Sequence, residues 1–365
     1  MKRFDWKLTI KMNISLMKVS GLWPSGDESY KPNFYTLYAS VLLTLLLLGH
    51  VFFQFVYVFL ILDDLQAVTA TSFLLLTEML IILKTYCLIR NMGMLKRLMA
   101  TLDSDLFQPK STEQILLVKP SLKFWKRIYN IFWSMALSAI FFWSAFPILD
   151  NSFKDYRLPF FAWYPYDTKA SPFYEITYIY QIICICFAAL VDIGIDTLIA
   201  ALNMYTGTQF DLLCDDLRNL HDPDEVDVSK KLIACIRHHK EILSFASNSN
   251  KFFNWIIFLQ FFVSAVSIGL TMFQLTVVAS FTNEFYSIMF YFNAAVVEIF
   301  MYCWFGNEVE IKSSKISYAV FECDWINMSQ KTKNAMTIFV LRCHRPLKIS
   351  TLNLFYLSLD TFVKM

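Results

Sequence analysis

Four acidic side chains lie inside long apolar stretches of this sequence, where charged residues are rarely tolerated. Glu78, Glu298 and the pair Asp192 and Asp196, one helical turn apart, each interrupt runs of Leu, Ile, Phe and Ala. A charge inside a bilayer costs free energy, so such residues face a bundle interior. There they either hydrogen-bond to neighbouring helices or form a path for ions or protons, and both interpretations stay open. Lys84, toward the cytoplasmic end of its segment, is expected to reach the membrane surface.

Other residues that could carry out chemistry give a less specific signal of function. On a helix the adjacent His238 and His239 would diverge by roughly 100°, so a solvated helix face is a better interpretation than a metal site. The acidic run 211–227 lacks EF-hand spacing and indicates a solvated loop and helix start. The sequence contains no HExxH, P-loop, nucleophile-elbow or CxxC motif. We therefore predict no enzymatic activity, no metal site and no cofactor.

The composition shows which elements must position these groups. Of the 365 residues, 56% are hydrophobic and 17% charged, against about a quarter charged in soluble domains. The predicted fold class is therefore an all-α integral membrane protein, with residues 1–365 in a single domain. Six apolar segments long enough to span a bilayer are expected within 34–305: they are 34–62, 65–88, 128–149, 176–204, 253–281 and 285–305.

A seventh apolar segment is expected at 346–365. Its apolar part, 349–363, covers about 15 residues or ~22 Å as a helix, short of the ~30 Å hydrocarbon core. We predict seven transmembrane helices, the last of them incomplete at its outer end. One face of that helix would present Leu354, Leu357, Ser358 and Thr361.

The distribution of basic residues predicts the orientation. Lys and Arg gather in the stretch 1–33 and in three connections, whereas the opposite side carries only Lys154, Arg157, Lys169 and Lys364. By the positive-inside rule the N-terminus is cytoplasmic and the C-terminus extracellular. This topology is the inverse of a G-protein-coupled receptor.

Aromatic rings with a few hydroxyl groups gather in the outer halves of the second, third, fourth and sixth segments. This mixture suits a small, semi-volatile apolar ligand held by shape and one or two hydrogen bonds. An interfacial aromatic belt plus ordinary core is the alternative. The candidate ligand-binding residues are Phe73, Thr77, Phe142, Trp143, Phe146, Tyr178, Tyr286 and Phe290.

A series of short motifs along the whole chain resembles those of insect odorant receptors. The match begins before the first segment and continues to the last residue, and its strength lies in the order of the motifs on this topology. The motifs are Gly21-Leu22-Trp23-Pro24, Leu158-Pro159, Trp163-Tyr164-Pro165-Tyr166-Asp167, Ser171-Pro172-Phe173-Tyr174, Cys303-Trp304-Phe305-Gly306-Asn307-Glu308-Val309, Arg345-Pro346-Leu347 and Ser358-Leu359-Asp360-Thr361-Phe362.

The resemblance implies a ligand-gated, non-selective cation channel in a heterotetramer with the shared odorant co-receptor, in the dendrite plasma membrane of an olfactory neuron. It implies that 306–345 is a cytoplasmic anchor helix and linker, with Trp325 as a packing anchor. It also implies that 346–365 lines the pore through Leu354, Leu357, Ser358 and Thr361. Because the chain lacks the long second cytoplasmic loop expected of the co-receptor, we interpret it as an odour-tuning subunit.

Three other function classes stay open. A G-protein-coupled receptor would need the opposite orientation. A gustatory-type receptor shares the topology but carries a Thr-Tyr…Gln-Phe signature in the last helix, which is not seen here. A secondary transporter would use Asp192, Asp196 and Glu298 for coupling and should show inverted repeats, of which the sequence shows none.

Overall fold

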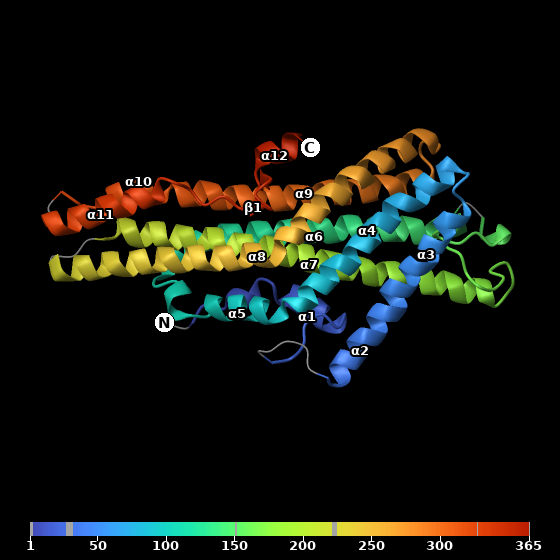
Figure 1. Ribbon diagram of the computed structural model, residues 1–365, viewed down its shortest axis with the longest axis horizontal. Coiled ribbons are helices and arrows are strands. Elements are labelled where there is room, and N and C mark those ends of the chain that lie inside the picture. The colour runs from blue at the N-terminus through green and yellow to red at the C-terminus, as the bar shows by residue number, and fades with distance from the viewer. Residues whose placement is uncertain (1–2, 27–31, 150–151, 221–224, 327, 365) are drawn as a thin grey trace.

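The computed structural model describes residues 3–26, 32–149, 152–220, 225–326 and 328–364, with the backbone alone at 146 and 225–227. Helices dominate, and the long ones lie side by side in an elongated bundle (Figure 1). In chain order the elements are η1 (Trp6–Leu8), α1 (Lys11–Val19), α2 (Phe34–Leu42), η2 (Leu43–Leu48), α3 (Gly49–Leu60), α4 (Leu65–Arg90), α5 (Met92–Leu102), η3 (Asp105–Phe107), α6 (Thr112–Leu149), η4 (Ser152–Asp155), α7 (Phe173–Arg218), α8 (Glu225–Val277), α9 (Asn283–Ser314), α10 (Ile316–Phe321), α11 (Gln330–Cys343), β1 (Ser350–Thr351), β2 (Phe355–Tyr356) and α12 (Leu359–Lys364).

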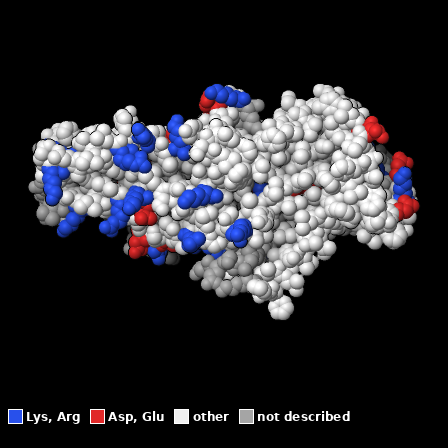
Figure 2. Space-filling model, viewed as in Figure 1, with Lys and Arg blue, Asp and Glu red and all other residues white. Residues whose placement is uncertain are grey.

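Two halves of the bundle are distinguished below. The half that carries the connection 152–172 is called the loop half, and the half that packs against α1 and α5 is called the terminal half. Figure 2 shows Lys and Arg side chains over the terminal half, whereas the loop half is almost entirely uncharged until its tip. An uncharged band beside a basic region is the surface expected of a membrane protein.

Six helical stretches in the described part of the chain are long and apolar enough to cross a membrane, which confirms the integral membrane class. They are Phe34–Leu60, Leu65–Arg90, Thr112–Ala145, Phe173–Arg218, Val228–Val277 and Asn283–Phe321. Several run well past the apolar segments seen in the sequence, because the polar connections keep a buried face at helical spacing. Val118 on α6, Leu213 on α7 and Leu232 on α8 are all buried in these extensions.

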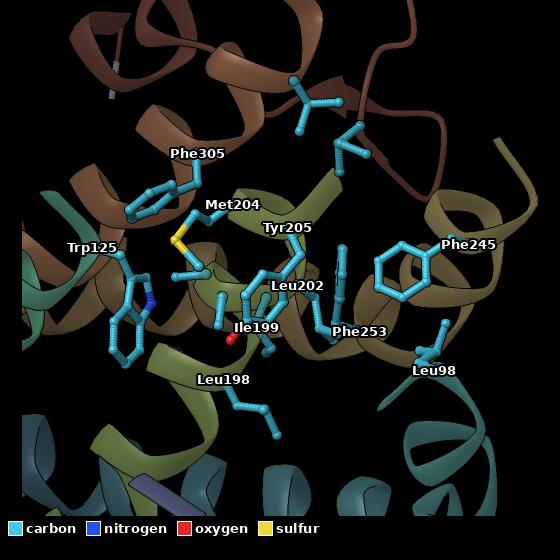
Figure 3. Packing of buried hydrophobic residues seen from close by; sticks show 14 of the residues in the cluster. Leu98, Trp125, Leu198, Ile199, Leu202, Met204, Tyr205, Phe245, Phe253 and Phe305 are labelled. Carbon is cyan, nitrogen blue, oxygen red and sulfur yellow. The ribbon is translucent and has the colours of Figure 1, made fainter. Parts of the chain in front are cut away.

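The terminal half is filled by large side chains, including some from the N-terminal stretch. Trp6 is fully buried, and its ring lies 5.8 Å from that of Tyr205 on α7. The Tyr205 hydroxyl donates to the Trp6 carbonyl at 2.8 Å, and Trp6 Nε1 donates to the Phe107 carbonyl at 3.2 Å. Figure 3 shows Tyr205 within a layer of rings and aliphatic chains from α5, α6, α7, α8 and α9.

Two polar stretches that the sequence predicts to be solvated instead pack against other helices in the terminal half. His238 and His239 are buried, with His238 Nε2 3.1 Å from Gln209 Oε1, so the prediction of a solvated face is wrong. The first part of the acidic run continues α7, and Asp211 accepts from Lys312 Nζ at 2.6 Å. The two histidines are buried and Asp211 is partly buried, because helices that continue beyond the apolar segments bring partners to them.

The continuous helix predicted over 349–363 is wrong. Its first part is a hairpin in which Ser350 pairs with Tyr356 and Thr351 with Phe355, and helix begins only at Leu359. Leu352 and Asn353 have φ angles of 49° and 58°, which close a tight turn between the strands. An apolar run of this length does not by itself distinguish helix from strand.

The hairpin leaves the expected pore residues in different settings, not on one helical face. Leu354 is exposed at the turn, Leu357 is buried, and Ser358 caps α12 by accepting from the Thr361 amide at 3.2 Å. Gly306 on α9 makes the close approach possible, since a Cβ there would lie 2.4 Å from Leu357 Cβ. Their place in a pore stays a prediction.

Candidate ligand-binding site

A cavity lies between five helices in the loop half. The space in it that is not filled by protein atoms, including the part that opens to the outside, is about 760 Å³. We call it the chamber. Its lining comprises Leu74, Thr77, Glu78 and Ile81 of α4, Phe132, Ala136, Ala139, Ile140 and Trp143 of α6, Ile185, Ala188, Ala189, Asp192 and Ile193 of α7, Gln260, Ser264 and Ser267 of α8, and Tyr291, Ala294, Ala295 and Glu298 of α9.

Small side chains create the chamber. Ala136 and Ala139 are three positions apart on α6 and share a face with Trp143, four positions further on. Alanine pairs on α7 and α9 line the opposite walls. Because a methyl group fills much less space than the Leu, Ile and Phe side chains elsewhere in these helices, their apposition leaves a gap in the bundle.

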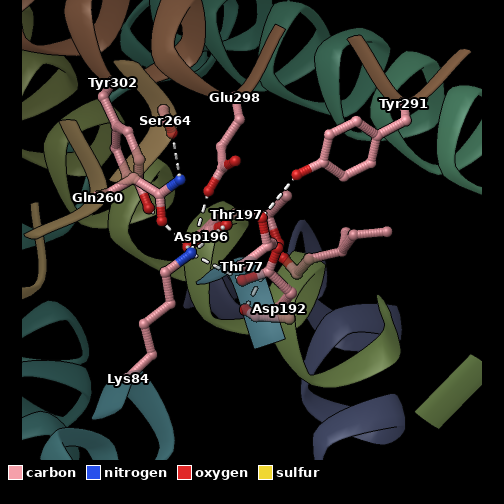
Figure 4. Close-up of polar contacts among 12 residues, drawn as sticks. Thr77, Lys84, Asp192, Asp196, Thr197, Gln260, Ser264, Tyr291, Glu298 and Tyr302 are labelled. Atoms are coloured by element: carbon pink, nitrogen blue, oxygen red, sulfur yellow. Dashed lines mark hydrogen bonds and ion pairs between the residues drawn. The ribbon is translucent and has the colours of Figure 1, made fainter. Parts of the chain in front are cut away.

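The wall formed by α4 and α9 carries hydroxyl groups among the apolar side chains. Thr77 Oγ1 lies 2.6 Å from the Tyr291 hydroxyl, and both groups line the chamber. On the α8 wall, Gln260 Nε2 donates to Ser264 Oγ at 2.8 Å. Figure 4 shows both pairs beside the buried charged groups. The chamber therefore offers an apolar surface with polar groups at defined points.

A cluster of buried charges forms one end of the chamber. Lys84 Nζ on α4 donates to Asp192 Oδ1 at 2.7 Å, Asp196 Oδ1 at 2.8 Å and Glu298 Oε1 at 3.0 Å (Figure 4). The Tyr302 hydroxyl donates to Asp196 Oδ1 at 2.6 Å. These contacts tie α4, α7 and α9 together. They are the ones expected if the acidic residues hydrogen-bond to neighbouring helices, the first interpretation above.

Lys84 does not reach the membrane surface, so that prediction is wrong. Its side chain is 1% exposed, because three carboxyl groups hold the ammonium in the interior and offset its desolvation. Asp192, Asp196 and Glu298 also bring carboxylate oxygens within 4.8 Å of one another, as cation ligands would. The Lys84 ammonium stands where such a cation would be held.

A second cavity lies between the chamber and the tip of the loop half. Trp143 and Leu74 line both cavities. The outer wall is the segment around Phe160, whose amide and carbonyl are both hydrogen-bonded at 3.0 Å by the buried Gln181 side chain. The connection 152–172 is thereby fixed over the chamber, and Trp143 separates the two spaces.

The candidate ligand residues fall into three groups. Thr77 and Trp143 line the chamber, and Phe73 lines the second cavity and stacks on Trp143 at 6.3 Å. Tyr178 donates to the Ser144 carbonyl and lies outside the chamber lining. The others form an aromatic stack between α6 and α9, also outside that lining: Phe142 stacks on Phe290 at 5.3 Å and lies 5.8 Å from Tyr286. The side chain of Phe146 lies outside the described residues.

Most of the chamber lining carries no aromatic ring, so the aromatic pattern of the sequence does not indicate it. The informative signal was the small residues, above all Ala188-Ala189 and Ala294-Ala295 inside otherwise bulky segments. Tyr291, one turn before the second pair, was a further signal. The buried acidic residues were recognised, although their position at the chamber wall was not.

The fold defines a multi-pass helical membrane protein whose bundle contains the chamber. A profile of the 7tm odorant receptor family matches residues 64–365, and the chain belongs to that family. It is 25% identical over 394 residues to odorant receptor Or1 of Anopheles gambiae, covering 99% of this chain and 93% of that protein. It is 21% identical over 349 residues to odorant receptor 46a, isoform A, of Drosophila melanogaster, covering 93% and 89%.

Solved structures show a similar fold. The structure of the insect olfactory receptor OR5 from Machilis hrabei in complex with eugenol superimposes with a TM-score of 0.86 at 16% identity. The match covers 98% of this chain and 94% of that one. The sequence-based assignment to an odorant receptor family, and to a receptor instead of an enzyme, is confirmed.

Proposed function

We propose that the chain is an odour-tuning subunit that binds a small apolar volatile molecule in the chamber and gates a non-selective cation channel. It would act in a heterotetramer with the shared odorant co-receptor, in the plasma membrane of olfactory neuron dendrites, with the N-terminus in the cytoplasm. The observation that carries the proposal is the chamber itself, an internal space lined by small apolar side chains and a few polar groups.

A single helix links the chamber to the C-terminal segment. α9 contributes Tyr291 and Glu298 to the chamber and, two turns beyond Glu298, Gly306 to the hairpin contact with Leu357. Phe300 of α9 also packs against Phe362 of α12, with ring centroids 5.5 Å apart. A ligand that displaces α9 in the chamber would therefore move the segment predicted to line the pore.

The tip of the terminal half supports the proposed assembly. Trp325 lies in the connection between α10 and α11 and is 39% exposed, and its ring lies 6.2 Å from that of Phe321. Other exposed apolar side chains lie on α10, on α11 and between them, in a part of the molecule that carries many basic residues, and exposed apolar patches mark protein interfaces. They are Tyr318, Phe321, Ile326, Ile338 and Leu341.

Current recording tests the proposal. Cells that express this chain with the co-receptor should give odorant-evoked cation currents within milliseconds, with no added nucleotide or G protein. Cells that express either subunit alone with the same odorants are the controls. Signals that need a G protein would favour the metabotropic alternative, and uptake of the odorant coupled to ions would favour a transporter.

A further inference from the structure

One oxygen of a carboxyl group in the chamber has no hydrogen-bond partner among the described residues. Glu78 lines the chamber from the middle of α4 and is 0% exposed. Its Oε1 accepts from Gln54 Nε2 of α3 at 3.3 Å and lies 3.6 Å from His50 Nε2, while Oε2 makes no such contact. A buried acceptor without a donor is costly, since it has lost water and gained nothing in return.

The lysine that could have paired with Glu78 is held elsewhere. Lys84 lies six residues further along α4, and its ammonium donates to Asp192, Asp196 and Glu298. The charged groups in the chamber lining are three carboxyl groups, those of Glu78, Asp192 and Glu298, with no Lys, Arg or His among the lining residues. Asp192 and Glu298 accept from the Lys84 ammonium, whereas Glu78 does not.

A second acceptor faces the same space. Gln260 on α8 lines the chamber and is buried, and its amide nitrogen is used by Ser264. Its Oε1 has no partner among the described residues. The α4 and α8 walls therefore each offer an acceptor, whereas the remaining lining is mostly Ala, Ile, Leu and aromatic.

We propose that the chamber selects a small, mainly apolar molecule that carries a hydrogen-bond donor, a hydroxyl or amine group, which donates to Glu78 Oε2. An ether or ester of the same shape offers no donor and leaves that oxygen unpartnered, and a ligand carboxylate offers no donor either and would have to bury its own charge. This inference rests on the proposed function and names the ligand class for the same site.

A panel of matched odorants distinguishes ligands that carry a hydrogen-bond donor from those that do not, without knowledge of the natural ligand. The panel has benzyl, cyclohexyl and hexyl skeletons, each as the alcohol, the amine, the methyl ether and the carboxylic acid. In cells expressing this chain with the co-receptor, we expect the alcohol or amine of the best skeleton to be about 10- to 100-fold more potent than its methyl ether. The acid should be the weakest member.

Two substitutions assign the effect to Glu78. Glu78→Leu removes the acceptor and should lower the potency of the alcohol and amine about tenfold or more, leaving the ether within about threefold. Glu78→Gln keeps the shape and a carbonyl acceptor, so the amine should lose more than the alcohol. Glu175→Gln, on an exposed residue in the first turn of α7, is the matched control. Surface labelling of each variant separates ligand selectivity from loss of folding.

The outcomes distinguish the two proposals. A wild-type receptor that responds to ethers or acids as strongly as to alcohols and amines would overturn the inference and leave the proposed function standing. An equal loss for every odorant in Glu78→Gln at normal surface level would also overturn it. Silence of the wild type to the whole panel, in cells whose co-receptor channels open to their own agonist, would overturn the proposed function.

Discussion

The terminal half and the loop half bury their side chains in opposite ways. Around Tyr205 the terminal half is filled by large rings (Figure 3), and the polar atoms of Tyr205 and Trp6 donate to buried backbone carbonyls. The chamber in the loop half is lined by several alanines, and there Glu78 and Gln260 each keep an oxygen that has no partner among the described residues. Dense packing specifies one structure, whereas unfilled space with polar groups suits a variable ligand.

The difference suggests a division of labour within one bundle. Changes in the terminal half should alter how much receptor is folded and assembled, without changing which odorants it prefers. Changes at the chamber should alter which odorants the receptor prefers, while the amount of folded receptor stays nearly constant. The charge cluster around Lys84 lies between the two and should behave as part of the structure.

The largest effect is expected for Lys84→Met. Removing the ammonium leaves Asp192, Asp196 and Glu298 buried without their cation, which costs about 3–5 kcal/mol. Thermal melting of a purified fluorescent fusion should show little folded protein, with partial recovery when Asp196→Asn is added. Lys240→Met, on an exposed residue of α8, is the matched control. Wild-type melting of Lys84→Met would mean that the cluster does not stabilise the bundle.

Trp6→Ala tests the terminal half alone. Loss of this fully buried ring and its bond to Phe107 should destabilise the receptor by about 3–5 kcal/mol and reduce its surface level. The rank order of odorant potency, measured as current, should stay the same. Leu8→Ala, two residues away at a side chain that is 66% exposed, should leave both unchanged. A changed rank order in Trp6→Ala would break the division between the halves.

Sequence reasoning succeeded where a property belongs to one segment and failed where it depends on a partner far along the chain. Hydropathy along single stretches located the six spans, and charges in them marked Glu78, Asp192, Asp196 and Glu298 as interior. The partner of Lys84, by contrast, lies 108 residues away at Asp192. No local pattern reveals that pairing.

The chamber and the hairpin were missed for the same reason. A cavity exists because alanines on α6, α7 and α9 face each other, and a single sequence does not give the relative rotation of those helices. The stretch 349–363 is apolar enough for a helix, yet its strand pairing depends on the turn at Leu352 and Asn353 and on the contact with Gly306. Tertiary contacts decide such short apolar runs.

Ala294→Val should change ligand preference without unfolding the receptor. Ala294 lines the chamber one turn after Tyr291 and one turn before Glu298. The two methyl groups that valine adds would therefore occupy part of the chamber. We expect potency to fall about 10- to 100-fold for the bulkiest active odorants and to change little for the smallest. Current recordings over a size series, with Ala234→Val at an exposed site of α8 as control, measure this. A uniform loss across the series would place the ligand elsewhere.

The smallest effect is expected at Tyr286, which the sequence alone ranks with Trp143. Trp143 lines the chamber and packs on Phe160 at 5.7 Å, so Trp143→Ala should enlarge the space and favour bulkier odorants about tenfold. Tyr286 is 38% exposed and touches the stack around Phe142, so Tyr286→Ala should keep every potency within about threefold. The pair therefore tests whether aromatic character or position at the chamber selects the ligand. If Tyr286→Ala reorders the odorants as strongly as Trp143→Ala, the stack between α6 and α9 is the binding site and the chamber is not.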